Sequence, residues 1–316
     1  MATTYVICHG HPGDLVTTRP LLHHLTKVSD TICIVRRHVA ALIADLPVQL
    51  CTYEADSPQI IREDRWSSLI GNIQTTDQDT IVDLVGTQPV MDWVALQLAH
   101  KRGLRFEIDE VLPYDHTVHW HTGVNDRAHV SLRYLRLLPG SEPSSEWSQE
   151  HFKLGLFRDS ALGRVTALAN RVALCPGSGR CGENKRMPDE FWKRLTRSLR
   201  ERGHQLVWFI GPDEESMAAL AEPGDVIEAG DWEAVKAAHR SCARAVTTDT
   251  CHMHIRAFLQ RQGIALFRRD DFYAWGSYPG FISGVEPPAT NDVQASLDEV
   301  LRLFDLHGAK PLLPND

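Results

Sequence analysis

The sequence predicts an α/β protein made of two doubly wound domains, each with a parallel sheet between layers of helices. Strand-like apolar runs alternate with helical segments through both halves of the chain, as in parallel sheets that helices cover on both faces. A glycine-bearing turn follows the first strand of each half, at residues 9–13 and 176–182. Ligands of such sheets bind at the carboxyl ends of the strands. Both turns are therefore candidate sites, and 316 residues suffice for two domains of ordinary size.

The expected elements follow from the apolar runs and from the turn residues between them. In the first half we expect strands near 4–8, 31–35, 48–51, 79–85 and 104–107, and helices at 15–26 and 89–101. In the second half we expect strands near 171–174, 205–210, 225–228, 243–248 and 263–267, and helices at 188–202, 213–221, 232–239, 251–261 and 292–306. Residues 139–146 are rich in Pro, Gly and Ser and read as a linker. The predicted domains are 1–155, with the linker from about 139, and 156–316.

Composition limits the classes of partner. Hydrophobic residues make up 43% and charged residues 23% of the chain, as in globular proteins. The net charge of −8 divides into −4 over residues 1–138 and −4 over the rest, so we expect no nucleic acid as partner. No apolar stretch reaches the roughly 18 residues that span a bilayer, and contact with a membrane surface stays open. Seven Cys without regular spacing and no evident secretory signal predict a cytoplasmic protein.

The most informative segment lies between residues 171 and 195. An apolar strand is followed by the glycine-rich loop 176–182, two cations and a helix start at Pro188. Backbone N–H groups at such a loop, together with a Lys, form a site for phosphate. No Gly-Lys-Ser/Thr ends the loop, so it is not the P-loop of nucleotide hydrolases, and we expect a diphosphate held for other chemistry. The candidate ligands are Ser178, Gly179, Lys185 and Arg186. The alternative is that the two cations are ordinary surface residues.

A second segment, about sixty residues further on, points to the same kind of ligand. The strand 243–248 ends in an acidic turn that leads into a helix. Thr250 is expected at the helix start, where its hydroxyl caps the helix or binds an anion. The residues singled out here are Asp249, Thr250, Cys251 and His254. A capped helix with a core-facing His is the alternative.

These motifs, in this order, resemble family 9 of the glycosyltransferases, the heptosyltransferases of bacterial lipopolysaccharide assembly and their relatives. The matching features are Pro-Gly-Ser followed by Lys-Arg-x-Pro, Asp-Thr-x-x-x-His at a strand end, the N-terminal strand with its Gly-Asp turn, and the segment 129–138. The resemblance implies a GT-B type fold, in which two Rossmann-like domains face a central cleft. In such enzymes the last helix often crosses back to the first domain.

The resemblance also implies an activity. It is inverting, metal-independent transfer of a sugar from a nucleotide-sugar donor, here an ADP-activated heptose, to the hydroxyl of a glycan or small-molecule acceptor, with no cofactor. Asp14 is then the base, and Lys185 with the loop 176–182 stabilises the leaving diphosphate. The implied donor ligands are Ser178, Gly179, Arg186, Glu215, Asp249, Thr250, Cys251 and His254. Cys251 stands where the family usually has Gly.

Each assignment has an alternative. Asp14 is also well placed to be a helix N-cap, and Glu215 to be an acidic residue that only favours the helix dipole. Histidines of two turns are weak candidates for the acceptor pocket, and without Cys partners they are poor evidence for a metal site. These histidines are His11, His119 and His121. Trp275 and Tyr278 either stack on a ligand or belong to a packed loop.

Two rival functions stay open at this point. One is a sugar-nucleotide epimerase of the same two-domain architecture, and the other is a nucleotide-sugar-binding protein without activity. An added acceptor separates the transferase from both rivals, since only the transferase forms a glycosidic product. The acidity of residues 1–138 favours a neutral or cationic acceptor over a polyanion.

Overall fold

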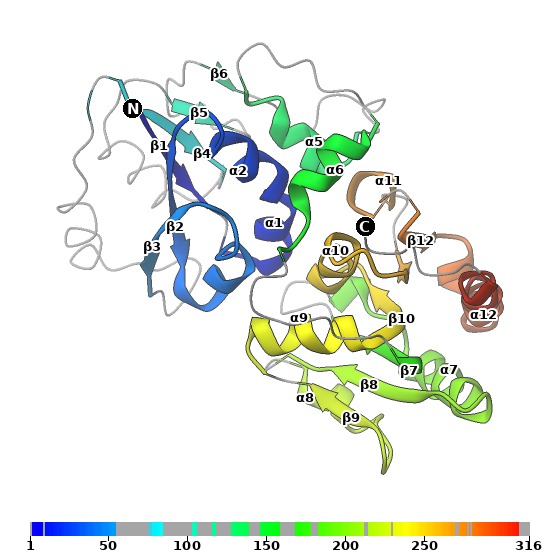
Figure 1. Cartoon of the computed structure of the whole chain (residues 1–316). Coiled ribbons are helices and arrows are strands. Elements are labelled where there is room, and N and C mark those ends of the chain that lie inside the picture. The colour runs from blue at the N-terminus through cyan, green and yellow to red at the C-terminus, as the bar shows by residue number, and fades with distance from the viewer. Residues whose placement is uncertain are drawn as a thin grey trace. The chain divides into compact units, whose positions relative to one another are not determined.

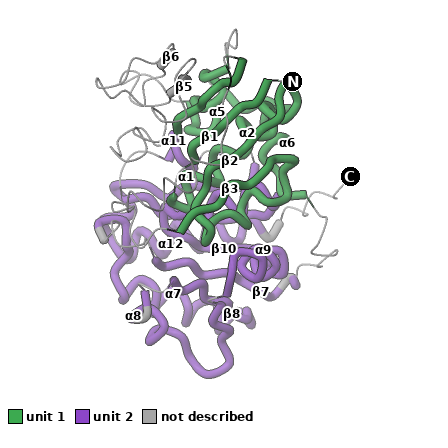
Figure 2. The backbone as a smooth tube through the Cα atoms, turned by 90° about the vertical axis from the view of Figure 1, so that its left-hand side faces the viewer, with its two compact units in different colours: residues 1–158 green, residues 159–316 purple. Residues whose placement is uncertain are grey.

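A computed structural model of the chain divides into two compact units, Met1–Arg158 and Asp159–Asp316, which Figure 2 colours separately. The structure describes residues 2–8, 10–54, 76, 78–84, 103–105, 116–117, 128–138, 146–158, 168–177, 183–211, 214–228, 230–268, 272–276, 278 and 280–309. The expected helix at 89–101 lies outside these residues.

The first unit contains a parallel sheet with the strand order β3-β2-β1-β4-β5-β6 (Figure 1). Its strands are β1 (Thr3–Ile7), β2 (Asp30–Arg36), β3 (Gln49–Tyr53), β4 (Thr80–Asp83), β5 (Gly103–Arg105) and β6 (His116–Thr117). The central strand β1 is buried from Thr4 to Ile7, because apolar side chains cover both of its faces. The five strands expected in this half are present, and the two-residue β6 is an addition.

The single helix expected over residues 15–26 is wrong, because two helices occupy this stretch. α1 (Pro12–Thr17) ends at Thr18, which also precedes α2 (Arg19–Leu25). Pro20 has no N–H and cannot continue the hydrogen-bond ladder of α1. The Thr18 hydroxyl instead donates to the carbonyl of Leu15 at 2.7 Å. A Pro near the first position of a helix is favourable, so the same residue that ends one helix fits the start of the next.

Arg19 fixes the last helix of the first unit. Its fully buried guanidinium forms a bidentate ion pair with Asp45, at 2.8 and 2.7 Å. It also donates to the carbonyls of Gly155 and Leu156, which end α6 (Gln149–Gly155). Bidentate Arg–carboxylate geometry is both strong and directional. The pair therefore holds α6 against α2, beside α5 (Val130–Leu135) and the 3₁₀ helix η1 (Arg37–Leu42).

The second unit has a six-stranded parallel sheet of the order β12-β11-β10-β7-β8-β9. The strands are β7 (Leu168–Cys175), β8 (Gln205–Phe209), β9 (Val226–Glu228), β10 (Cys242–Thr248), β11 (Gly263–Leu266) and β12 (Ile282–Val285). β7 and β10 are neighbours, with Cys175 paired to Thr247. The carboxyl ends of the two strands that precede the candidate phosphate motifs therefore lie side by side.

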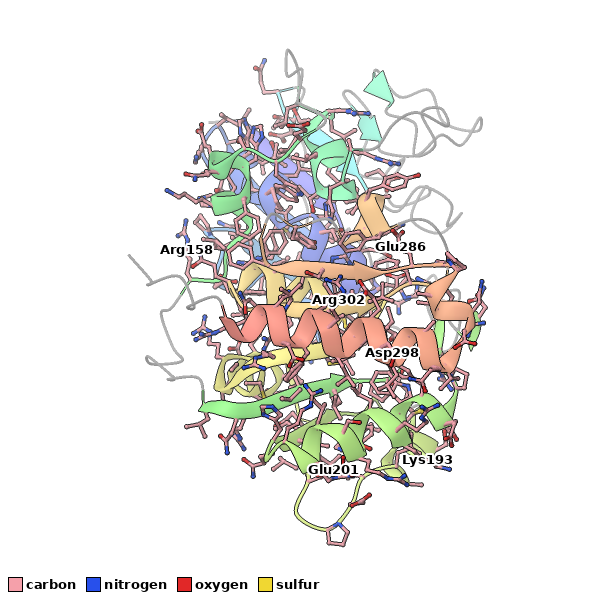
Figure 3. The ribbon with its side chains drawn as sticks, turned by 90° about the vertical axis from the view of Figure 1, so that its right-hand side faces the viewer. Arg158, Lys193, Glu201, Glu286, Asp298 and Arg302 are labelled. Atoms are coloured by element: carbon pink, nitrogen blue, oxygen red, sulfur yellow. The ribbon has the colours of Figure 1, made fainter. Side chains whose placement is uncertain are left out.

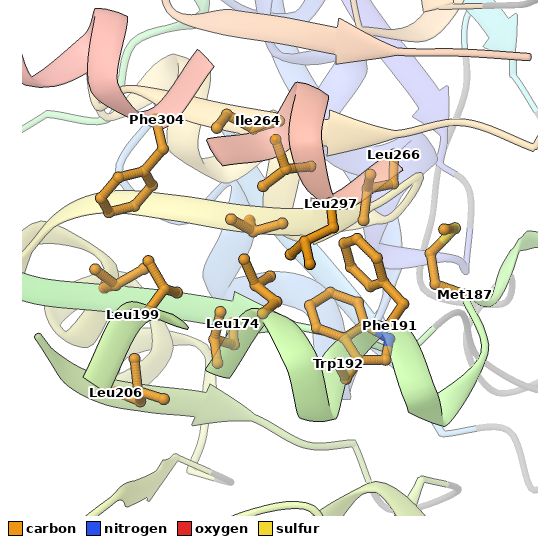
Figure 4. Close-up of a cluster of buried hydrophobic side chains, with 14 of the residues drawn as sticks. Leu174, Met187, Phe191, Trp192, Leu199, Leu206, Ile264, Leu266, Leu297 and Phe304 are labelled. Carbon is orange, nitrogen blue, oxygen red and sulfur yellow. The ribbon is translucent and has the colours of Figure 1, made fainter. Parts of the chain in front are cut away.

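Helices cover both faces of this sheet. α7 (Asp189–Glu201) and α12 (Val293–Ala309) pack on one face, and α9 (Trp232–Ser241) and α10 (Cys251–Phe258) pack on the other. The charged residues labelled on α7 and α12 in Figure 3, Lys193, Glu201, Asp298 and Arg302, are exposed. Apolar side chains of the same two helices form a core with the strands, shown in Figure 4, that includes Phe191, Trp192, Leu297 and Phe304. α12 packs against its own unit, and its crossing to the first unit stays a prediction.

Two parts of the second unit differ from expectation. The segment around Trp275 and Tyr278, predicted as a loop, contains the short helix α11 (Phe272–Trp275), and the edge strand β12 follows it. β12 is only four residues long and half-buried at Ser283 and Gly284. So short a segment does not show the alternation of apolar and polar residues that would predict a strand. α8 (Glu215–Ala218) is much shorter than the helix expected over 213–221. None of the described helices is both long and apolar enough to cross a bilayer.

Arg256 ties several elements of the second unit together from within. Its side chain is fully buried, on α10. Its two terminal nitrogens donate to backbone carbonyls, those of His239 at 2.8 Å, Cys242 at 2.9 Å, Ala243 at 3.2 Å and Gln262. Burial lowers its pKa to about 10, so the group stays charged at neutral pH and its hydrogen bonds are charge-assisted.

Candidate active site

The ends of β7 and β10 join the glycine loop to the acidic turn. The hydroxyl of Thr248, the last residue of β10, donates to the carbonyl of Gly177 and lies 3.4 Å from that of Cys175. Both Thr248 and Gly177 are buried. The start of the loop is thus fixed to the strand that delivers Asp249. Ser178 and Gly179 lie outside the described residues, so their contribution stays a prediction.

Lys185 reaches across this edge of the sheet. It ends the 3₁₀ helix η2 (Glu183–Lys185), and its Nζ lies 2.5 Å from Oδ2 of Asp249. The Lys side chain is 40% exposed, whereas that of Asp249 is 9% exposed. The two residues predicted from separate motifs therefore meet, with the cation on the solvent side. Arg186, next in the chain, is half-buried.

The start of α10 presents backbone N–H groups beside this pair. Thr250 is the N-cap residue, as predicted, but its hydroxyl does not cap the helix. It lies 3.5 Å from the carbonyl of Thr248. Burial, and next the charge of Glu214, raise the pKa of the Cys251 thiol to about 12. Because this thiol stays neutral, the first turn of α10 carries no negative charge of its own against an anion.

Glu214 is a site residue that the sequence did not single out. Its carboxylate accepts a hydrogen bond from the N–H of Gly211 at 3.1 Å, and the residue is 8% exposed. It also lies against Gly177, where an added Cβ would be 1.8 Å from Oε2. The sequence pointed to Glu215, whose backbone begins α8 and whose side chain is not described. Two adjacent Glu at a helix start give no signal that separates them.

His254 lies deeper than expected. It is 3% exposed, and its Nδ1 lies 2.7 Å from the hydroxyl of Tyr278. Tyr278 is itself 2% exposed and packs edge-on against Phe258. Of the two readings of Tyr278, the packed core is therefore correct. A direct contact of His254 with a donor stays a prediction.

Asp14 lies in the first unit and is not a helix N-cap. His11 occupies that position without a capping bond, Pro12 follows, and Asp14 belongs to the first turn of α1. The alternative structural role is therefore wrong. Within the described residues the Asp14 carboxylate has no hydrogen bond or ion pair, and the residue is half-buried. Its carbonyl accepts a hydrogen bond from the Thr17 hydroxyl at 2.7 Å.

The turn before α1 packs closely on an arginine. An added Cβ on Gly10 would lie 2.5 Å from Nε of Arg36, the last residue of β2. Because Arg36 ends β2, it lies at the carboxyl edge of the first sheet. It is 6% exposed. His11 is exposed at the same turn. The other two weak acceptor candidates, His119 and His121, lie outside the described residues.

The sequence matches the model of a known family. The model of glycosyltransferase family 9 (heptosyltransferase) matches residues 133–292, just over half of the 316 residues. The chain belongs to glycosyltransferase family 9. The matched part of this family 9 enzyme contains both candidate phosphate motifs and Glu214, and it ends ahead of α12. No curated protein matches the sequence.

Solved structures agree with the family on the fold. A glycosyltransferase family 9 protein from Veillonella parvula is 15% identical with a TM-score of 0.72, covering 97% of each chain. The E. coli heptosyltransferase WaaC with ADP is 18% identical with a TM-score of 0.70, covering 97% of this chain and all of its own. A putative UDP-N-acetylglucosamine 2-epimerase from Listeria monocytogenes is 14% identical with a TM-score of 0.55, covering 96% of this chain and 88% of its own. The family 9 glycosyltransferase therefore has the GT-B fold, with two Rossmann-like α/β units.

Proposed function

We propose that this enzyme transfers a sugar with inversion from a nucleoside-diphosphate sugar to an acceptor hydroxyl. The observation that carries the proposal is the ion pair of Lys185 and Asp249 beside the start of α10. A Lys, a helix N-terminus and a glycine loop at one sheet edge form an anion site. The resemblance to the family implies a transfer without a metal ion, and Lys185 and the helix N-terminus are the groups proposed to face the diphosphate instead.

The proposed reaction gives separate roles to Asp14 and to Lys185. The acceptor oxygen attacks the anomeric carbon, the bond from that carbon to the β-phosphate oxygen breaks, and Asp14 takes the acceptor proton. A carboxylate accepts this proton late, as the oxygen bonds to an electron-poor carbon. Negative charge grows on the departing diphosphate, and Lys185 with the N–H groups of Cys251 and its neighbours stabilises it.

The donor that we propose is an ADP-activated heptose. Two structures of E. coli WaaC support this choice, one described with ADP and one with ADP-2-deoxy-2-fluoro heptose. In the present chain, the buried Glu214 beside Gly177 is a suitable acceptor of hydrogen bonds from ribose hydroxyls. Ser178, Gly179, Arg186 and Glu215 remain proposed donor ligands, and His11, His119 and His121 proposed acceptor ligands.

For the acceptor, we propose a neutral or cationic glycan or small molecule. The −4 balance of residues 1–138 supports this over a polyanion. The test is transfer to a phosphorylated lipopolysaccharide core compared with its dephosphorylated form. Faster transfer to the dephosphorylated form is expected. A strong preference for the phosphorylated form would instead assign the enzyme to lipopolysaccharide core assembly.

The decisive experiment combines binding with product analysis. ADP, UDP, ADP-heptose and UDP-N-acetylglucosamine are compared by thermal shift, since a ligand of the native state raises the melting temperature. We expect ADP-heptose to give the largest shift and to yield a glycosidic product only with an acceptor. Epimerised sugar without an acceptor would establish the epimerase, and binding with neither product would establish a binding protein.

A further inference from the structure

Three side chains with metal-binding atoms meet on the face of the second sheet that α9 and α10 cover. Cys175 ends β7, His239 lies in the last turn of α9 and His252 lies in the first turn of α10. The sulfur and the ring nitrogens all lie within 4.8 Å of one another. Cys175 is 1% and His239 0% exposed, and His252 is half-buried. Three separate elements thus contribute one ligand each to a single buried point.

The two rings are already held in place. Nε2 of His239 lies 2.9 Å from Nδ1 of His252. The ring of Phe209 stacks on His239, with centroids 4.0 Å apart and planes 4° from parallel. Nδ1 of His239 is buried and has no hydrogen-bond partner among the described residues. The stacking on Phe209 and the contact between the two rings hold Nε2 of His239 and Nδ1 of His252 close together.

The chemistry of the three side chains suits a cation of the zinc class. Zinc binds imidazole nitrogen and thiolate sulfur, and a bound dication would itself deprotonate the sulfur of Cys175.

We propose that Cys175, His239 and His252 bind one divalent transition-metal ion of the zinc class. Zinc takes tetrahedral sulfur and nitrogen ligands at about 2.3 Å and about 2.0–2.1 Å, which implies separations of about 3.3 Å between nitrogens and about 3.6 Å between sulfur and nitrogen. The distance of 2.9 Å between Nε2 of His239 and Nδ1 of His252, and the upper limit of 4.8 Å between the ligand atoms of the three residues, bracket these separations. Small side-chain rotations therefore suffice. A water molecule would complete the fourth position.

The ion has a positioning role rather than a chemical one. Cys175 directly precedes the glycine loop, and His252 directly follows Cys251 in the first turn of α10. A metal between them fixes the distance between the loop and the backbone N–H groups of the helix. The site therefore stands apart from the proposed transfer step, and its test needs no substrate.

The test is a titration of the full-length protein with Co²⁺ after treatment with a chelator and a thiol-free reductant. A thiolate-to-cobalt charge-transfer band at one ion per chain is expected, and Zn²⁺ should abolish it. Cys175→Ser should remove the band, and His252→Gln should weaken binding about 100-fold or more. Cys242→Ser removes another buried thiol of the same unit, and His204→Gln another histidine. Both controls should bind like the wild type.

The outcomes are distinct. Zn²⁺ at a hundredfold excess over its Kd should also raise the melting temperature by about 5–10 °C. Absence of the band in the wild type, or a band that persists in Cys175→Ser, overturns the proposal. If Cys175→Ser does not fold, His252→Gln decides: unchanged cobalt affinity overturns the site, and the large loss supports it.

Discussion

Lys185 and Asp249 form an ion pair across the carboxyl ends of two neighbouring strands, with 2.5 Å between Nζ and Oδ2. The carboxylate is 9% exposed and the Lys side chain 40%. Pairs with a partner this accessible contribute little to stability. The pair matters more for where it holds a cation, since Asp249 fixes the direction of the Lys side chain while leaving it open to a ligand. Each residue also changes the charge that the other presents to a diphosphate.

Removing Lys185 should therefore affect turnover more than folding. Lys185→Ala should lower kcat by about 100-fold or more, the usual loss for a group that stabilises developing charge. It also leaves Asp249 as an unpaired negative charge at the site. Lys185→Ala/Asp249→Asn should then regain part of the donor affinity that Lys185→Ala loses. Steady-state kinetics and donor titrations measure both effects.

The matched control for this experiment is Lys193→Ala, an exposed Lys on α7 (Figure 3). It should keep wild-type kcat and donor affinity. Wild-type turnover by Lys185→Ala at saturating donor would falsify the assignment of Lys185.

Asp14→Asn should separate catalysis from folding. Because His11, not Asp14, is the N-cap of α1, the substitution changes no capping bond. We expect an unchanged melting temperature, unchanged donor binding and loss of most sugar transfer, since an amide accepts no proton at neutral pH. Asp30→Asn, at an exposed position of β2, is the control. Near-normal transfer by Asp14→Asn would mean that another group is the base.

Gly177→Ala tests the contact with Glu214. The new Cβ would lie 1.8 Å from the carboxylate, which must move away. Overpacking of this kind costs about 1–3 kcal/mol, or about 2–10 °C in melting temperature. Gly177→Ala/Glu214→Ala should recover the stability but not donor affinity, if Glu214 binds the ribose. Equal melting temperatures for Gly177→Ala and the wild type would show that the glycine is not required there.

Asp79 provides a pH-dependent prediction for the first unit. Burial by itself raises the pKa of this carboxyl, but the backbone N–H groups of Thr3 and Thr76 donate to it, at 2.8 and 2.7 Å, and hold the pKa below its ordinary value. Asp79→Asn should cost about 1–3 kcal/mol at pH 7. Because the pKa is lower in the folded state, the ionised carboxylate stabilises the fold at pH values above the unfolded pKa of about 3.9. This stabilisation is lost as the pH falls through the folded pKa. The difference between variant and wild type should therefore shrink below about pH 4 in urea titrations. A difference that stays constant down to pH 3 would contradict this account.

Much of the fold could be predicted from the sequence because the two doubly wound units obey a simple alternation. The placement of the loop after β7 and the turn after β10 at one edge of the sheet followed from the same rule, since both sit at carboxyl ends of parallel strands. That β7 and β10 are neighbours in that sheet is known only from the structure. The break at Thr18 could not be predicted with the same assurance. A Pro inside a helical pattern is compatible with a kink, a break or the first turn of a second helix, and only packing selects among them.

Side-chain placement was the other limit. Glu214 and Glu215 have the same chemistry, and only the folded backbone determines that Glu214 lies against Gly177. The depth of His254 depends on Tyr278, which lies twenty-four residues away and follows a helix too short to predict. The cluster of Cys175, His239 and His252 comes from three elements with no sequence spacing in common. Such sites are set by tertiary contacts, and periodicity carries no information about them.

The four carbonyls bound by Arg256 have a consequence for how the second unit opens. They belong to the end of α9, the start of β10 and the approach to β11, whereas the guanidinium belongs to α10. None of these segments can move away without breaking charge-assisted bonds in the protein interior. Their amides should therefore exchange with solvent in one cooperative opening. The last turn of α10, to which Arg256 belongs, is then kept rigid from its buried side, before any ligand arrives.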